Sequence, residues 1–94
     1  MADVEVKELK SDEGGWEYDV LVREDDTESA HAVTVGRAYY ESLTGAEVPP
    51  DKLVKKSFEF LLEREPKESI MSRFDLTVIS NYFPEYESRI KDYF

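Results

Sequence analysis

Few residues of this chain are of types that carry chemistry, and His31 is the first to consider because it is the sole histidine. An imidazole can act as a general base near neutral pH if a nucleophile or substrate lies within reach. The hydroxyl residues near it in sequence are Thr27, Ser29 and Thr34, and nothing in their spacing fixes a catalytic triad. We expect His31 to pack in a strand or to donate a hydrogen bond to a neighbour. A small enzyme that uses His31 is an alternative.

Few other residues are candidates for a metal-binding or phosphate-binding site. The acidic run at residues 24–28 could offer oxygen ligands to Ca²⁺ or Mg²⁺, but its spacing does not match an EF-hand loop. Gly14 and Gly15 lack the residues that flank phosphate-binding glycines, so they indicate a hairpin turn. The chain has no cysteine, which excludes disulfides and thiolate metal sites. We therefore predict no catalytic residue, no metal site and no cofactor.

Composition limits the class of protein. The 94 residues are enough for a single domain, residues 1–94, and carry a net charge of −10. Thirteen of the 22 acidic residues lie in residues 1–48, against four of the 12 basic ones. This charge disfavours binding to a phosphate backbone, which relies on Lys and Arg. No apolar run is long enough to span a membrane and the start of the chain does not resemble a signal peptide, so we expect a cytoplasmic protein.

The hydrophobic period changes at Gly36. Before it, apolar and polar residues alternate, as in half-buried strands, and Gly14-Gly15 and residues 24–27 provide short turns. After it, apolar residues recur at helical spacing. The sequence therefore predicts an α+β fold, in which a three-stranded antiparallel β-meander (residues 1–35) is followed by three to five helices (residues 36–94) packed on one sheet face. The expected strands are 4–10, 16–23 and 29–35.

The helical half is divided by turn signals. Gly45 is an expected left-handed cap for the first helix, and Pro49-Pro50 precede a second helix whose apolar arc is broad enough to make it central. Pro66 and Pro84 separate the later helices, and Asp75 is an expected N-cap. The expected helices are 37–43, 51–64, 67–73, 76–82 and 85–94.

Two of these helices, within residues 67–83, superficially resemble a helix-turn-helix. Thr77, Ser80 and Asn81 could then read base edges. Residues 76–83 contain no Lys or Arg, however, so phosphate contacts would have to come from neighbouring segments. Nucleic-acid binding through residues 67–83 is a second alternative.

Several segments resemble a small prokaryotic protein family of uncharacterised function. The matching segments are HAVTV (31–35), FLLEREPKESI (60–70), FDL (74–76) and YFPEY (82–86). The resemblance covers most of the chain from His31 onward. It implies a bacterial or archaeal cytoplasmic protein, and it implies no activity or catalytic residue.

These observations favour a small acidic interaction module without catalysis. Its partner would be another protein, or a second copy of the chain in a homodimer. Aromatic residues crowd the C-terminus, and exposed aromatic patches mark protein contacts. The outer sheet face is a second candidate surface. The predicted partner-binding residues are Tyr82, Tyr86, Tyr93 and Phe94 in the first surface, and Glu17, Asp19 and Arg23 in the second.

Overall fold

Three long antiparallel strands form the first half of the chain. The computed structural model describes residues 2–94. Strands β1 (Asp3–Asp12), β2 (Gly15–Glu24) and β3 (Thr27–Gly36) pair in that order through tight turns. The antiparallel pairing of these three strands, inferred from the short turns between them, is therefore confirmed. Each strand has ten residues, more than expected, because polar residues at its ends continue the ladder.

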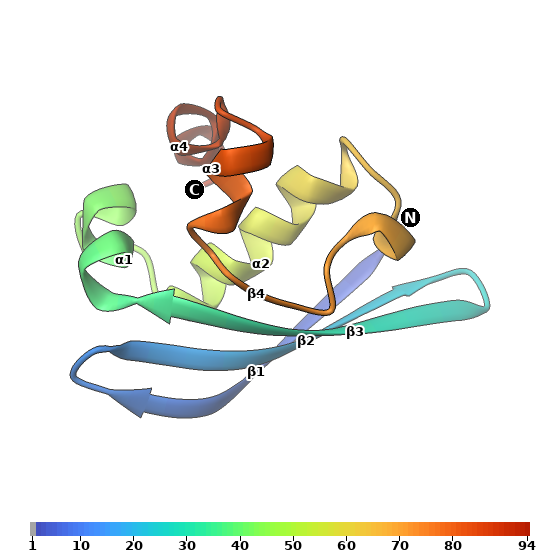
Figure 1. The fold of residues 1–94 in the computed structure, drawn as a ribbon, viewed down its shortest axis with the longest axis horizontal. Coiled ribbons are helices and arrows are strands. Elements are labelled where there is room, and N and C mark those ends of the chain that lie inside the picture. Colours follow the sequence, from blue (N-terminus) through green and yellow to red (C-terminus); the bar gives the residue numbers. More distant parts are fainter. Residues whose placement is uncertain (1) are drawn as a thin grey trace.

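A fourth strand corrects the prediction of a three-stranded sheet. β4 (Arg73–Asp75) lies beside β3 and parallel to it, which makes the sheet mixed, with the order β1-β2-β3-β4. The helix expected over residues 67–73 is wrong, because this segment forms one 3₁₀ turn, η1 (Lys67–Ser69), and then extends into β4 (Figure 1). A strand of three residues is too short to show an alternation of period two.

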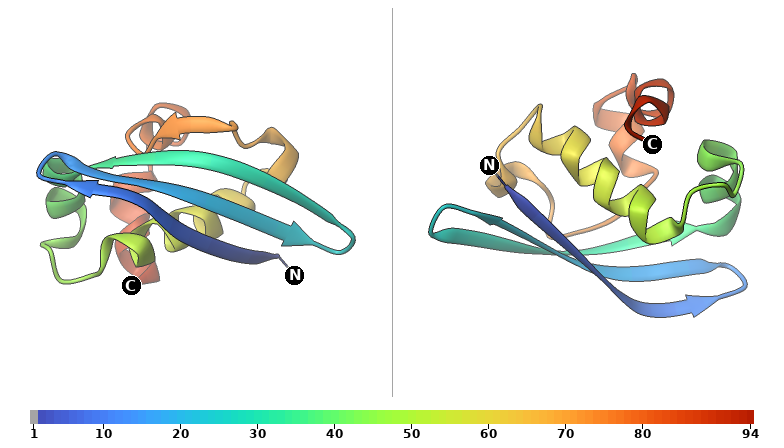
Figure 2. Two further views of the ribbon diagram at one scale, coloured as in Figure 1. Left: turned by 90° about the horizontal axis from the view of Figure 1, so that it is seen from below. Right: turned by 180° about the vertical axis from the view of Figure 1, so that it is seen from behind.

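The helices lie on one face of the sheet and leave the other face uncovered (Figures 1 and 2). Helix α1 (Arg37–Thr44) ends as predicted at Gly45, which has a φ of 64° and donates its N–H to the Glu41 carbonyl. α2 (Pro50–Leu62) begins with proline in its first turn. The C-terminal elements are shorter than expected: α3 (Val78–Tyr82), α4 (Tyr86–Arg89) and the 3₁₀ turn η2 (Ile90–Tyr93).

Helix α2 is the central element of the core, as its broad apolar arc indicated. Phe58 faces the sheet side, where its ring centroid lies 5.3 Å from that of His31 and 5.9 Å from that of Phe74. Phe60 is two residues further on, roughly 200° around the helix. It packs edge-on against Tyr86 at 5.2 Å, on the side of the C-terminal helices. Because α2 is buried on both sides, it joins the sheet to those helices.

The backbone conformation of Gly15, at the β1–β2 turn, can be tested by substitution. Gly15 has a φ of 150°, and a Cβ placed there would lie 2.0 Å from the Val35 carbonyl oxygen. We expect Gly15→Ala to lower the free energy of unfolding by about 2 kcal/mol or more, since the obstacle is backbone. Gly14→Ala is the matched control, because its Cβ would meet only the Asp12 side chain, at 3.4 Å. Urea unfolding measures both, and equal losses would contradict this account.

Candidate functional site

His31 is a buried structural residue in this fold. It is 3% exposed and makes a hydrogen bond through each ring nitrogen. Its Nδ1 lies 2.8 Å from the Met71 carbonyl oxygen, which can only accept, so the proton is assigned to Nδ1. Nε2 then accepts from the Ser29 hydroxyl at 2.8 Å. The ring thus ties β3 to the segment before β4, in agreement with the expected packing role.

The helix-turn-helix geometry considered for residues 67–83 is absent, since a 3₁₀ turn and a strand precede the five-residue α3. Asp75 ends β4 instead of capping a helix directly. Its carboxylate accepts hydrogen bonds from the Thr34 hydroxyl at 2.6 Å and from the Thr77 hydroxyl and N–H. Burial by itself would raise the pKa of Asp75. The hydrogen bonds from Thr34 and Thr77 stabilise the carboxylate and hold this pKa below its ordinary value. Thr77 and Ser80, proposed as base readers, use their hydroxyls in local bonds.

The four predicted C-terminal aromatic residues do not form one surface. Tyr86 is fully buried, so it belongs to the core and is not accessible to a partner. Its hydroxyl donates to Ser57 Oγ at 2.6 Å, because that serine donates its own proton to the Leu53 carbonyl. Tyr93 is half-buried against Phe60 and donates to the Glu63 carboxylate. Phe94 is 39% exposed and Tyr82 is 68% exposed.

The predicted residues of the outer sheet face are exposed, and each lies opposite a residue of the other charge on a neighbouring strand. Arg23 contacts the carboxylates of Glu5 and Glu28 at 3.5 and 3.3 Å. Glu17 pairs in register with Lys10, and Asp19 with Lys7. Such exposed pairs contribute little to stability. Asp19 also lines an open hollow of about 630 Å³ on the sheet.

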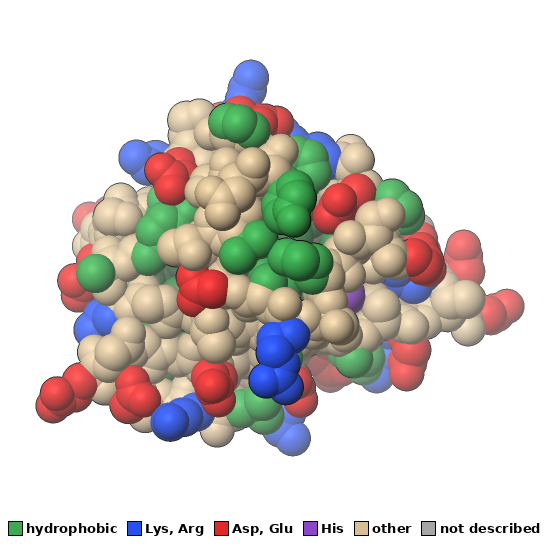
Figure 3. Space-filling view, in the orientation of Figure 1, with side chains coloured by type: hydrophobic (Ala, Val, Ile, Leu, Met, Phe, Trp, Pro, Cys, Tyr) green, Lys and Arg blue, Asp and Glu red, His purple; other side chains and the backbone are tan. Residues whose placement is uncertain are grey.

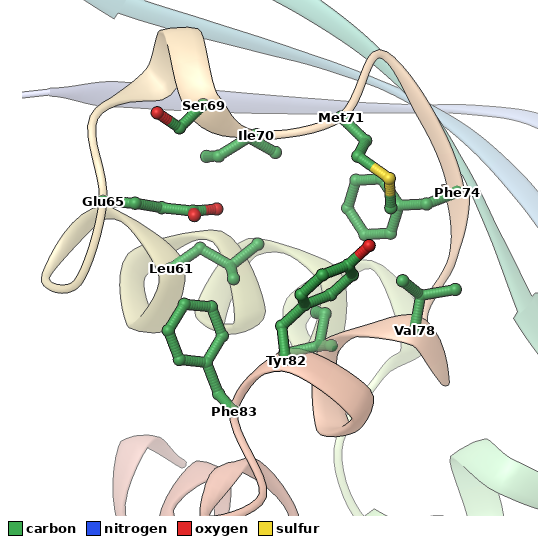
Figure 4. A pocket seen from close by; sticks show the side chains of 10 residues that line it. Leu61, Glu65, Ser69, Ile70, Met71, Phe74, Val78, Tyr82 and Phe83 are labelled. Atoms are coloured by element: carbon green, nitrogen blue, oxygen red, sulfur yellow. The ribbon is translucent and has the colours of Figure 1, made fainter.

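An apolar groove lies between the segment before β4 and helix α3, above the end of α2. Its volume is about 180 Å³, and Figure 3 shows hydrophobic side chains gathered on this face of the molecule. Tyr82 is the one predicted partner-binding residue that lines it, and the half-exposed Met71 lies across from it (Figure 4). The lining residues are Leu61, Glu65, Ser69, Ile70, Met71, Phe74, Val78, Ile79, Tyr82 and Phe83.

Glu65 places a carboxylate inside this apolar lining. Figure 4 shows its side chain pointing into the groove, between Ile70 and Leu61. Burial raises the pKa of Glu65 above its ordinary value, and no charge among the described residues counters this effect. The neighbouring cations have other partners: Arg64 contacts Glu85 at 3.2 Å, and Lys67 contacts Glu68 at 2.6 Å. Within residues 2–94, the Glu65 side chain has no hydrogen bond or ion pair of its own.

The walls of the groove are held by specific contacts. The hydrogen bond from His31 fixes the Met71 carbonyl on one wall. The Asp75 carboxylate fixes the entry to α3 on the other, by joining β3 to Thr77. Leu61, near the end of α2, also lines the groove. The groove is therefore positioned by the sheet as well as by the helices.

Sequence reasoning missed most of the groove. The helix expected over residues 67–73 does not form, so the sequence did not predict that Ile70, Met71 and Glu65 line one groove. One available signal was Pro66, which lies after the end of α2 and immediately before η1, where the chain turns back toward the sheet. No local pattern, however, shows that Tyr82 and Met71 meet across the groove.

Comparison with known proteins gives no assignment. No family model matches the chain, and neither does any curated protein or any solved structure. Among the described residues, no helix is both long enough and apolar enough to cross a membrane. In the same residues, no group of three or more His, Cys, Asp or Glu side chains could hold a metal ion. The groove is thus the candidate site that the geometry itself supplies.

Substitution of Tyr86 tests its assignment to the core. Tyr86→Ala should lower the free energy of unfolding by about 3–5 kcal/mol, because it leaves a cavity beside Phe60. Tyr86→Phe should cost about 1 kcal/mol, since it removes one hydrogen bond and keeps the ring. Urea unfolding measures both values. A loss below about 1 kcal/mol for Tyr86→Ala would place this ring outside the core.

Removal of the charge at Glu65 and removal of the charge at Glu68 should change the melting temperature in opposite directions. The folded-state pKa of Glu65 is raised, so its ionisation as the pH increases destabilises the fold. Glu65→Gln should therefore raise the melting temperature at pH 7. The hydrogen bond from buried Lys67 lowers the pKa of Glu68, so Glu68→Gln should lower the melting temperature at pH 7.

Both differences should shrink as the pH falls below the ordinary carboxylate range, where the wild-type side chains are also neutral. Thermal unfolding monitored by circular dichroism between pH 3 and pH 7 measures them. A destabilised Glu65→Gln variant at pH 7 would mean that the Glu65 carboxylate has a favourable partner in the fold, contrary to the contacts described.

Proposed function

We propose that this protein is a non-catalytic interaction module that binds another protein through the groove between Met71 and Tyr82. The observation that carries the proposal is a shaped apolar groove with an exposed aromatic residue and an exposed methionine on its walls. Aromatic and methionine side chains are enriched in protein interfaces, where they supply contact area and adapt to the partner. Anchors of this kind contribute most of the binding energy.

The two hydrogen bonds made by the His31 ring support a role without catalysis. Both ring nitrogens already have partners, and the side chain is almost fully buried. A general base must be within hydrogen-bond reach of the proton it removes. In this protein the imidazole instead positions the Met71 wall of the groove.

We also propose that the protein acts in the cytoplasm of a prokaryotic cell. The absence of cysteine from the sequence supports a compartment in which disulfides are not used for stability. The net charge of −10 supports a partner with a basic surface, because opposite potentials accelerate encounter.

Affinity capture with two surface variants tests the interaction. Tyr82→Ser removes the exposed aromatic of the groove, and Leu9→Ser removes an exposed apolar residue of similar accessibility in β1, as the control. Wild type and Leu9→Ser should recover the same protein from the native lysate. We expect at least about a tenfold lower recovery with Tyr82→Ser.

Both variants should unfold within about 0.5 kcal/mol of wild type, since both side chains are exposed. This control separates lost binding from lost folding. Recovery of the partner in equal amounts with all three proteins, or its loss with Leu9→Ser as well, would contradict the assignment of the groove as the binding surface.

A further inference from the structure

The size of the groove limits what it can bind. Its volume is about 180 Å³, and pockets for small-molecule ligands are typically about 300–1,000 Å³. One or two side chains fit into such a space, but a cofactor does not. The walls formed by Met71, Phe74, Val78 and Tyr82 are apolar surfaces, so an apolar side chain is the natural occupant.

The Glu65 carboxylate favours a ligand that also carries a positive charge. Its side chain points into the groove, and the cations beside it in sequence are paired elsewhere. Helix α3, which forms the opposite wall, contributes no charged residue. A carboxylate kept beside apolar side chains costs stability unless a cation or a donor reaches it. A bound partner can supply that cation.

We propose that the groove binds a segment of another protein in which an apolar side chain fills the space between Met71 and Tyr82 while a nearby Lys or Arg pairs with Glu65. The two partner residues would be about two residues apart in an extended segment, or three to four apart in a helix, because those spacings put side chains on one face. This inference rests on the proposed function and adds the chemistry of the partner.

The binding should depend on pH in a defined direction. The carboxylate attracts a cation only when ionised, and burial raises the pKa of Glu65 above its ordinary value. Tyr82 is the other titratable side chain among the lining residues. Arg64 and Lys67 lie on the adjoining segments, paired with Glu85 and Glu68, and Arg73 belongs to β4. Affinity should therefore fall as the pH is lowered through the pKa of Glu65.

Selection from a displayed library of random twelve-residue peptides tests the inference. Wild type should enrich peptides that combine an aliphatic or aromatic residue with a Lys or Arg at the stated spacing. Glu65→Gln should enrich the same apolar residue without the basic one. Glu47→Gln is the charge-matched control, because this exposed residue lies in the loop between α1 and α2, outside the groove. It should give the wild-type motif.

An enriched peptide, made synthetically, should bind Glu65→Gln at least about tenfold more weakly than wild type and should bind Glu47→Gln equally well. A wild-type motif without a basic residue would overturn the inference. So would a basic preference that survives in Glu65→Gln, since it would then come from the overall charge. Either result leaves the proposed function standing if Tyr82→Ser abolishes binding of the peptides.

Two other outcomes have different meanings. If no peptide depends on Tyr82, both the inference and the assignment of the groove as the binding surface fail. Analytical ultracentrifugation of the purified chain tests for a second copy as the occupant. A wild-type dimer that Tyr82→Ser dissociates would overturn the inference, because the groove would then be filled by this protein itself.

Discussion

The burial of α2 between the sheet and the C-terminal helices is the interaction on which the rest of the structure depends. A sheet of this size has one apolar face that must be covered, and α2 covers it with Val54 and Phe58, both fully buried. The opposite side of the same helix carries Phe60, which packs against Tyr86. Because one helix serves both layers, the short elements after it need few residues to stay in place.

The return of the chain to the sheet after α2 creates the groove. Residues 63–72 cross from the end of the helix to β3, where β4 adds three parallel residues. Two long-range hydrogen bonds fix that crossing, one from His31 to the Met71 carbonyl and one from Thr34 to Asp75. Backbone bonds also hold this strand to β3, from the Ala32 N–H to the Ser72 carbonyl at 2.8 Å and from the Leu76 N–H to the Thr34 carbonyl at 2.9 Å. The groove is the space left between this crossing and α3.

Hydrophobic periodicity predicted the long, regular elements of the fold. It failed for the short elements, whose structure is determined by tertiary contacts. The strands at 16–23 and 29–35 and the helix at 51–64 were predictable because each presents several turns or alternations to one core. Strand β4 was not predictable, because three residues are too few to show an alternation. A strand forms there because β3 has a free edge with which it can pair. The groove residue Tyr82 was predictable as an exposed aromatic, whereas the role of Glu65 depends on neighbours distant in sequence.

The contrast between Lys67 and Glu65 shows why the carboxylate points to function. Lys67 is 4% exposed, and its ammonium group is paired with Glu68 at 2.6 Å. This fold can therefore pair a buried charge where stability requires it. Two residues earlier, Glu65 lies against apolar side chains with its pKa raised by burial, and within residues 2–94 its carboxylate forms no ion pair. A neutral side chain at this position would cost the fold less, and our proposal that a basic residue of a partner binds in the groove gives this charge a role.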